Sequence, residues 1–125
     1  MKTNRSTEKI SLIQDIDTPA VIVDLKIVEE NINTYQKYCD DIGITLRPHI
    51  KTHKIPKFAK MQIDAGAVGI TCQKISEAEA IISEGEINDI LITFNIIGDE
   101  KVQRLRNLSD KVNLIAGGLA DTQKL

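Results

Sequence analysis

Residues 47–54 bring together both histidines of the chain, three cationic side chains and a proline. If this run ends a β-strand, the alternation of side chains places Arg47, His49 and Lys51 on one face. Lysine forms Schiff bases with carbonyl compounds, and neighbouring cations or partial desolvation lower the pKa of a lysine toward neutrality. Pro48 lacks an amide hydrogen and therefore suits the end of a strand, where parallel α/β folds place their ligands. The segment predicts Lys51 as a carbonyl-reactive lysine with His49 and Arg47 beside it.

The same segment has two simpler interpretations. Lys54, Lys57 and Lys60 recur every three residues, which is typical of the solvated face of an amphipathic helix. Together with Lys51 they would also suit an anion-binding or RNA-binding patch. His49 and His53 lie four residues apart, as metal ligands on a helix do, but no third or fourth ligand follows at a standard spacing. We therefore expect no metal site within this chain.

Composition narrows the class of protein. The chain has 125 residues, of which 42% are hydrophobic, 27% charged and 3% aromatic, as in an ordinary soluble globular domain. The formal net charge of -2 and the pI near 5.7 argue against nucleic acid or an anionic membrane as a partner. No apolar run approaches the roughly 20 residues that span a bilayer, and no signal peptide is evident at the polar N-terminus. Cys39 and Cys72 form no disulfide framework, so we expect a reducing, cytoplasmic setting.

The hydrophobic pattern predicts an α/β fold. After a polar N-terminal arm, residues 1–16, we expect a strand at 18–23 and a helix that starts near Leu25 and stops at Gly43. Further strands are predicted at 44–51, 67–73, 90–95 and 112–116, and further helices at 56–65, 76–84, 99–109 and 119–125. Alternating strands and helices with short links indicate a parallel sheet. Either a small doubly wound sheet or the first half of a (β/α)8 TIM barrel fits this order, and an end inside a helical pattern favours a truncated barrel over residues 17–125.

Four motifs in order carry a resemblance to a known family. They lie at residues 17–19, 47–54, 69–78 and 89–98, and together they span residues 17 to about 115. This part of the chain resembles the N-terminal part of the D-threonine aldolase and D-serine dehydratase family. The resemblance implies a pyridoxal phosphate enzyme of the alanine racemase type, which consists of a (β/α)8 barrel and a β-domain.

The resemblance also implies roles for particular residues. Lys51 resembles the Schiff-base lysine that holds pyridoxal phosphate, while His49 and Arg47 would adjust its protonation or the electrostatics of the cofactor. Gln73 ends the next predicted strand and would form a hydrogen bond near the cofactor ring, unless it is simply a polar residue at a strand end. Asn95 ends the following strand in the same way and ranks below Gln73.

The expected reaction is a lyase reaction on a D-amino acid. A D-threonine aldolase would cleave D-threonine to glycine and acetaldehyde, whereas a D-serine dehydratase-like ammonia-lyase or an amino acid racemase would break other bonds at the α-carbon. The family is expected to use a divalent metal (Mn, Zn or Mg) bound in a C-terminal domain and to form homodimers.

Departures from the family pattern leave room for an inactive barrel fragment that needs a partner chain. Gly117 and Gly118 stand where relatives are expected to carry an aspartate and a small polar residue, and the turn at 83–89 is one residue longer than expected. The predicted strand at 18–23 is expected to join the C-terminal β-domain rather than the barrel.

Overall fold

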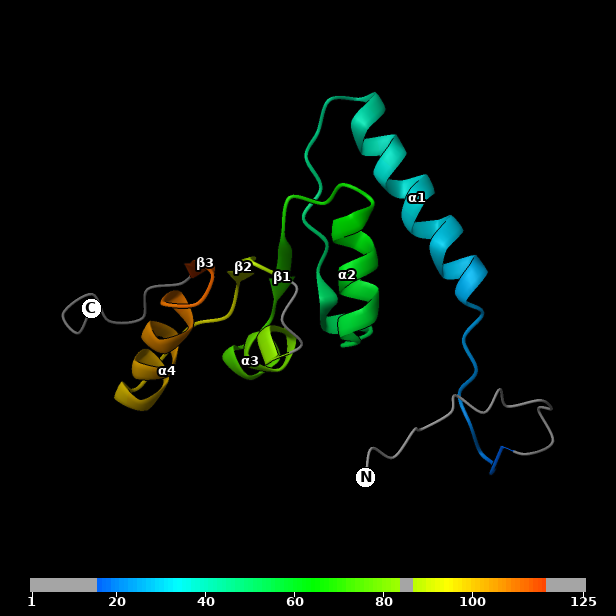
Figure 1. The fold of residues 1–125 in the computed structure, drawn as a ribbon. Coiled ribbons are helices and arrows are strands. Elements are labelled where there is room, and N and C mark those ends of the chain that lie inside the picture. The colour runs from blue at the N-terminus through cyan, green and yellow to red at the C-terminus, as the bar shows by residue number, and fades with distance from the viewer. Residues whose placement is uncertain (1–15, 84–86, 117–125) are drawn as a thin grey trace, which may run out of the picture.

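Three short parallel strands form the sheet (Figure 1). The computed structural model describes residues 16–83 and 87–116. Within these ranges β1 (Ile70–Cys72), β2 (Asp89–Ile92) and β3 (Asn113–Ala116) lie in the order β1-β2-β3. Ile70 pairs with Ile90, which in turn pairs with Leu114, so that residues in register share one face of the sheet.

The helices alternate with the strands as the sequence predicts. They are α1 (Leu25–Asp41), α2 (Pro56–Asp64), α3 (Ile75–Ser83) and α4 (Asp99–Ser109), and a 3-10 turn, η2, covers Ile50–Thr52. The carboxylate of Asp24 caps α1 by accepting hydrogen bonds from the amides of Lys26 (2.9 Å) and Ile27 (3.3 Å). Just after α1, residue 43 has a φ of +72°. Glycine is favoured at this position because it adopts that left-handed conformation without steric cost. In the order β1-α3-β2-α4-β3, a helix connects each strand to the next, which is the crossover connection that parallel strands require.

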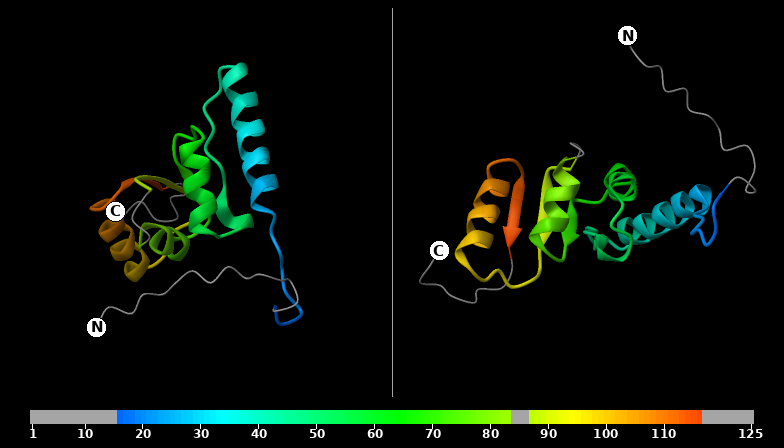
Figure 2. Two further views of the ribbon diagram at one scale, coloured as in Figure 1. Left: turned by 45° about the vertical axis from the view of Figure 1, so that its right-hand side comes forward. Right: turned by 90° about the horizontal axis from the view of Figure 1, so that it is seen from below.

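The hydrophobic core lies between the sheet and the helices. Ile70, Cys72, Ile90 and Ile92 are fully buried and alternate with residues of the other face. They pack against buried residues of α2, α3 and α4, namely Ala59, Ala78, Ile81 and Leu108. α1 contacts α2 and lies beyond it, at the end of the row of elements that Figure 2 shows from α1 to α4. The helices therefore cover one face of the sheet.

The opposite face is progressively more exposed from β1 to β3. It includes the in-register residues Thr71, Leu91 and Ile115. Thr71 is 6% exposed beside residues 47–49, Leu91 is half-buried, and Ile115 is 54% exposed. In the part of the chain that the structure describes, no helix packs over this face at β3. A doubly wound sheet would have both faces covered.

Two predicted strands are wrong. Residues 18–23 form no strand, and Val21 is 94% exposed. Residues 44–51 are extended only as far as 49, where His49 forms an isolated parallel bridge with Thr71, and they then enter η2. The buried side chain of Ile50 and a hydrogen bond from the amide of Lys54 to the carbonyl of Ile50 (2.8 Å) favour a tight turn over further strand pairing. The predicted helix at 119–125, Gly117, Gly118 and most of the arm at 1–16 lie outside the described residues.

No helix in the described ranges is both long enough and apolar enough to cross a membrane.

Candidate active site

The predicted reactive lysine lies in the turn that follows residues 44–49. Lys51 is the central residue of η2 and its side chain is exposed, whereas the neighbouring Ile50 is 1% exposed and anchors the turn in the core. The amide of Thr71 donates a hydrogen bond of 2.7 Å to the carbonyl of Pro48, which joins the segment to β1. Lys51 therefore follows the bridge between His49 and Thr71 at the carboxyl end of the sheet. It lies on a turn rather than on the predicted strand.

His49 caps the lysine turn. Its Nδ1 accepts a hydrogen bond of 3.3 Å from the amide of Lys51. Burial lowers the pKa of His49, the charge of Lys51 lowers it further, and Glu77 together with a hydrogen bond to the backbone of Thr71 opposes this shift. The imidazole is consequently uncharged at neutral pH. His49 and Lys51 are thus brought together, as the sequence predicts.

Glu77 connects the lysine turn to the end of β1. It lies in the first turn of α3, and its side chain is 6% exposed. Its Oε2 accepts a hydrogen bond from the amide of Gln73 at 2.8 Å, and its Oε1 lies 3.3 Å from Lys54 Nζ. Burial alone would raise the pKa of Glu77, but the Gln73 amide and the charges of Lys54 and Lys74 outweigh that effect and lower it. Glu77 is therefore a buried carboxylate anion between two chain segments.

Arg47 lies at the other end of the sheet. Its Nη1 forms an ion pair with Asp89 Oδ1 at 2.5 Å, and Asn113 Nδ2 lies 3.3 Å from Asp89 Oδ2. Asp89 and Asn113 are the first residues of β2 and β3. Gly69 leaves room for this cluster, because a Cβ there would lie 2.7 Å from Asp89 Oδ1 and 2.8 Å from the carbonyl oxygen of Asp89. The structure does not bring Arg47 to the carboxyl end, where Gln73 lies.

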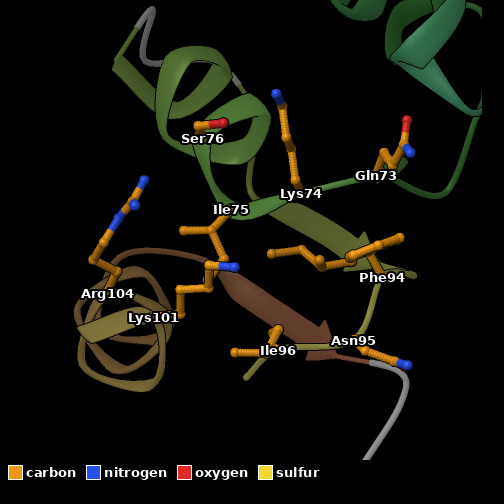
Figure 3. Close-up of a pocket in the computed structure, with 10 residues that line it drawn as sticks. Gln73, Lys74, Ile75, Ser76, Phe94, Asn95, Ile96, Lys101 and Arg104 are labelled. Carbon is orange, nitrogen blue, oxygen red and sulfur yellow. The ribbon is translucent and has the colours of Figure 1, made fainter. Parts of the chain in front are cut away.

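Gln73 and Asn95 line a separate pocket between α3 and α4 (Figure 3). This pocket has a volume of about 250 Å³, and its apolar lining residues include Ile75, Ile92 and Phe94. In Figure 3, Lys101 and Arg104 project from α4 on the side opposite Gln73, Phe94 and Asn95. The two predicted strand-end amides therefore line the same pocket, with Phe94 between them in Figure 3, and Lys51 is not among the residues of this pocket.

The remaining candidates have structural partners. His53 Nδ1 accepts a hydrogen bond of 3.0 Å from the amide of Ile55, and its ring packs edge-to-face with that of Phe58, with 5.6 Å between the ring centroids. Lys54 precedes α2 and is not part of the predicted helix face, which leaves Lys57 and Lys60 on that helix. Within residues 16–83 and 87–116, no group of three or more histidine, cysteine, aspartate or glutamate side chains could hold a metal.

Cys72 is unsuited to nucleophilic chemistry despite its place in the third motif. Its side chain is fully buried, and burial together with the charge of Glu77 raises the pKa of the thiol to about 12. Cys39 is also free and buried. Both cysteines therefore act as small apolar side chains in this fold.

Sequence reasoning missed Glu77 and Asp89 as site residues. A glutamate at the third position of a helix often binds a backbone amide at the helix start, so the position of Glu77 was a usable signal. The partner of Asp89 is 42 positions away in the sequence, and no local pattern marks such a pair.

The chain resembles known enzymes in sequence. No protein-family model matches it. Over 94 residues it is 40% identical to the D-threonine aldolase of Arthrobacter sp.. The matched region covers 75% of this chain and 24% of that enzyme. Over 112 residues it is 36% identical to the D-threo-3-hydroxyaspartate dehydratase of Delftia sp.. This matched region covers 88% of this chain and 29% of the relative. The chain thus spans about a quarter of the length of these curated relatives.

Solved structures of the same kind share the fold. The crystal structure of the D-threonine aldolase from Filomicrobium marinum matches with a TM-score of 0.79 and 38% sequence identity, over 83% of this chain and 28% of that one. The D-threo-3-hydroxyaspartate dehydratase from Delftia sp. matches with a TM-score of 0.70 and 35% identity, over 77% of this chain and 25% of that one. Since sequence and fold agree, the chain is homologous over about three quarters of its length to one portion of the D-threonine aldolase and D-serine dehydratase family of lyases.

Proposed function

We propose that this chain carries the lysine-bearing part of a pyridoxal phosphate-dependent lyase that acts on D-amino acids with a β-hydroxyl group. The observation that carries the proposal is the exposed Lys51 in a turn capped by an uncharged histidine. The relatives are named for D-threonine, 3-hydroxy-D-aspartate and D-serine, and each of these compounds is a D-amino acid with a hydroxyl on the β-carbon. The proposed reaction is D-threonine aldolase-like cleavage of the bond between the α- and β-carbons.

The residues present fit a carbonyl cofactor. An accessible primary amine is the group that an aldehyde requires, and Lys51 supplies it. Three lysines around the turn, Lys51, Lys54 and Lys74, outnumber the carboxylate of Glu77 that lies among them. Such an excess favours the approach of anionic compounds, including phosphates and amino acid carboxylates.

The chain's own residues would divide the work as follows. Lys51 Nζ would bind the cofactor aldehyde, and His49 would hold the backbone of that lysine through its Nδ1. The Gln73 side chain is exposed at the end of β1 and would offer a hydrogen bond to a ligand, and Asn95 lines the same pocket. Pyridoxal phosphate, when bound, supplies a ring that stabilises negative charge at the substrate's α-carbon.

Arg47 takes a different role in this proposal from the one that the sequence suggested. Its ion pair with Asp89 at the start of β2 gives it a structural task. We propose that it stabilises the segment that carries Lys51 rather than binding the cofactor.

We further propose that the sheet is the beginning of a (β/α)8 barrel of the alanine racemase type. The support is the one-sided cover of the sheet, since a barrel encloses the face that the helices leave free. The increasing exposure from Thr71 through Leu91 to Ile115 follows that face. A cytoplasmic homodimer with a divalent metal near the substrate hydroxyl completes the proposal, and one matching structure is a variant of the dehydratase in its metal-free form.

A dehydratase is the second candidate. The match to the Delftia sp. dehydratase covers 88% of this chain, against 75% for the Arthrobacter sp. aldolase. The two reactions differ in product, because an aldolase releases glycine and an aldehyde whereas a dehydratase releases ammonia and an oxo acid. Product analysis therefore separates the two candidates.

A chimeric enzyme tests the proposed function. The corresponding segment of the Filomicrobium marinum D-threonine aldolase is replaced by residues 17–116 of this chain, and the chimera is supplied with pyridoxal phosphate, a divalent metal and D-threonine. We expect glycine formation that disappears with Lys51→Ala. A folded chimera that binds the cofactor at another lysine, or that keeps its turnover after Lys51→Ala, would contradict the proposal.

A further inference from the structure

Glu77 joins two segments that meet beside the reactive lysine. One of its carboxylate oxygens accepts the hydrogen bond from the amide of Gln73, and the other lies 3.3 Å from Lys54 Nζ. The Glu77 side chain is 6% exposed, whereas that of Lys54 is 57% exposed. A buried carboxylate that lost its cation would keep an uncompensated charge away from water. Removing the Lys54 ammonium would therefore cost more than removing one partner of an ion pair whose two side chains are both exposed.

Lys54 stands where the lysine turn leaves η2. Its φ of 53° is a left-handed conformation, which costs a side-chain-bearing residue roughly 1 kcal/mol or more. Its amide donates a hydrogen bond of 2.8 Å to the carbonyl of Ile50, which closes the turn around Lys51. The ion pair with Glu77 thus acts on a strained residue that determines the shape of this turn.

Helix capping accounts for only half of what Glu77 does. A glutamate in the first turn that accepts a hydrogen bond from a preceding amide resembles a capping box, and the amide of Gln73 satisfies that description. The second oxygen, Oε1, is buried and has no well-aligned hydrogen bond, so its stabilising partner is the ammonium of Lys54. Capping alone does not require that contact.

We propose that Glu77 is a positioning residue for Lys51, which fixes the turn at residues 50–54 against the carboxyl end of β1 through Lys54 and the amide of Gln73. The inference rests on the proposed function of Lys51. In this account Glu77 touches neither the cofactor nor the substrate. Its contribution is to keep the Lys51 amine in one place beside His49.

The charges around the turn provide an independent readout. Glu77 faces Lys54 and Lys74, while His49 faces Lys51 and Glu77. Since the charge of Glu77 raises the pKa of His49, removing that charge with Glu77→Gln lowers this pKa further. His53, the second histidine of the chain, has no contribution from Glu77 and serves as an internal control in an NMR titration.

The main experiment compares two glutamates of the same helix. The 125-residue chain is treated with pyridoxal phosphate and borohydride, and mass spectrometry gives the ratio of modified Lys51 to modified Lys57. We expect Glu77→Gln to lower this ratio about fivefold, equivalent to about 1 kcal/mol. Glu79→Gln is the matched control, because Glu79 pairs with Arg104 of α4 instead of with the turn. Its ratio is expected to equal that of the unaltered chain.

Further variants separate positioning from folding. Lys54→Met is expected to lower the ratio as Glu77→Gln does, and the double variant no further, because both changes break one interaction. Glu77→Asp, which keeps the charge, is expected to restore the pKa of His49. Circular dichroism confirms that each variant is folded before it is compared.

The outcomes distinguish this inference from the proposed function. If the unaltered chain is modified at another lysine and not at Lys51, the proposed function fails. If Lys51 is modified but folded Glu77→Gln and Glu79→Gln give the same ratio, the function stands and the positioning role of Glu77 is refuted, whatever the pKa of His49.

Discussion

The two ends of the sheet differ in how their charged side chains are paired. At the amino end, the half-buried Arg47 is matched by Asp89, which also receives a hydrogen bond from Asn113. At the carboxyl end, one buried carboxylate, Glu77, lies among several lysines, and Lys51 is exposed. A matched pair stabilises a fold without attracting ligands, whereas an excess of cations favours anionic partners. Under the proposed function, stability and chemistry lie at opposite ends of the same strands, as in barrel enzymes generally.

Gly69→Ala is the strongest way to disturb the amino end. The new Cβ would lie 2.8 Å from the carbonyl oxygen of Asp89, so the backbone must shift and the Arg47 pair must open. We expect a loss of about 3 kcal/mol in the free energy of unfolding, as measured by urea denaturation. Gly43→Ala is the control, because it places a side chain at a φ of +72° with nothing within 4 Å, and is expected to cost about 1 kcal/mol. Equal losses in both variants would mean that crowding at Gly69 is unimportant.

Removing the cation of the matched pair should weaken the fold but spare the chemistry. Arg47→Met leaves Asp89 half-buried with only Asn113 as a partner, and we expect a loss of about 2 kcal/mol in unfolding free energy. The ratio of modified Lys51 to modified Lys57 is expected to stay unchanged in the folded variant. If Arg47→Met instead lost Lys51 modification selectively while keeping full stability, Arg47 would act on the cofactor, as the sequence suggested.

Acid should act on the two ion pairs of α3. The hydrogen bond from Arg104 lowers the pKa of Glu79, and the contacts of Glu77 lower its pKa despite its burial. A carboxyl whose pKa is lower in the folded state adds stability above its ordinary value of about 4.5, and that stability is lost as pH falls through the folded pKa. We therefore expect the urea midpoint to fall below pH 4.5, and to fall less in Glu79→Gln. Identical acid profiles would show that this pair contributes nothing.

The smallest expected effect concerns the thiols. Since the pKa of Cys72 is raised to about 12 and both cysteines are buried, alkylation with iodoacetamide at pH 8 should proceed only as fast as the chain opens. Gly69→Ala should accelerate the reaction more than Glu79→Gln does, because crowding at Gly69 is expected to cost more unfolding free energy than loss of the Glu79–Arg104 ion pair. Rapid alkylation of the folded, unaltered chain would contradict the burial of these residues.

Local patterns in the sequence predicted most of the elements. The spacing of apolar residues marked α1 to α4, and runs of isoleucine, leucine and valine marked the segments that contain β1, β2 and β3. The predicted strands were longer than the observed ones. At the end of β1, for example, the amide of Gln73 binds Glu77 instead of another strand.

The site was harder to predict because its shape depends on contacts between distant residues. Alternation along a strand placed Lys51 beside His49, and the two do lie together, but a capped turn rather than a strand joins them. The same alternation placed Arg47 with them, and its direction is determined by Asp89, 42 positions away. Hydrophobic period and turn residues reveal local structure, whereas non-local ion pairs require the fold.

The most direct test of the account is to identify which lysine reacts. The chain is incubated with pyridoxal phosphate, reduced with borohydride and digested, and every lysine-containing peptide is quantified. The account predicts that Lys51 carries most of the modification, and that Lys51→Ala abolishes it without increasing it elsewhere. Modification of Lys54 or Lys57 with Lys51 unmodified would contradict the assignment of the carboxyl end as the site of chemistry.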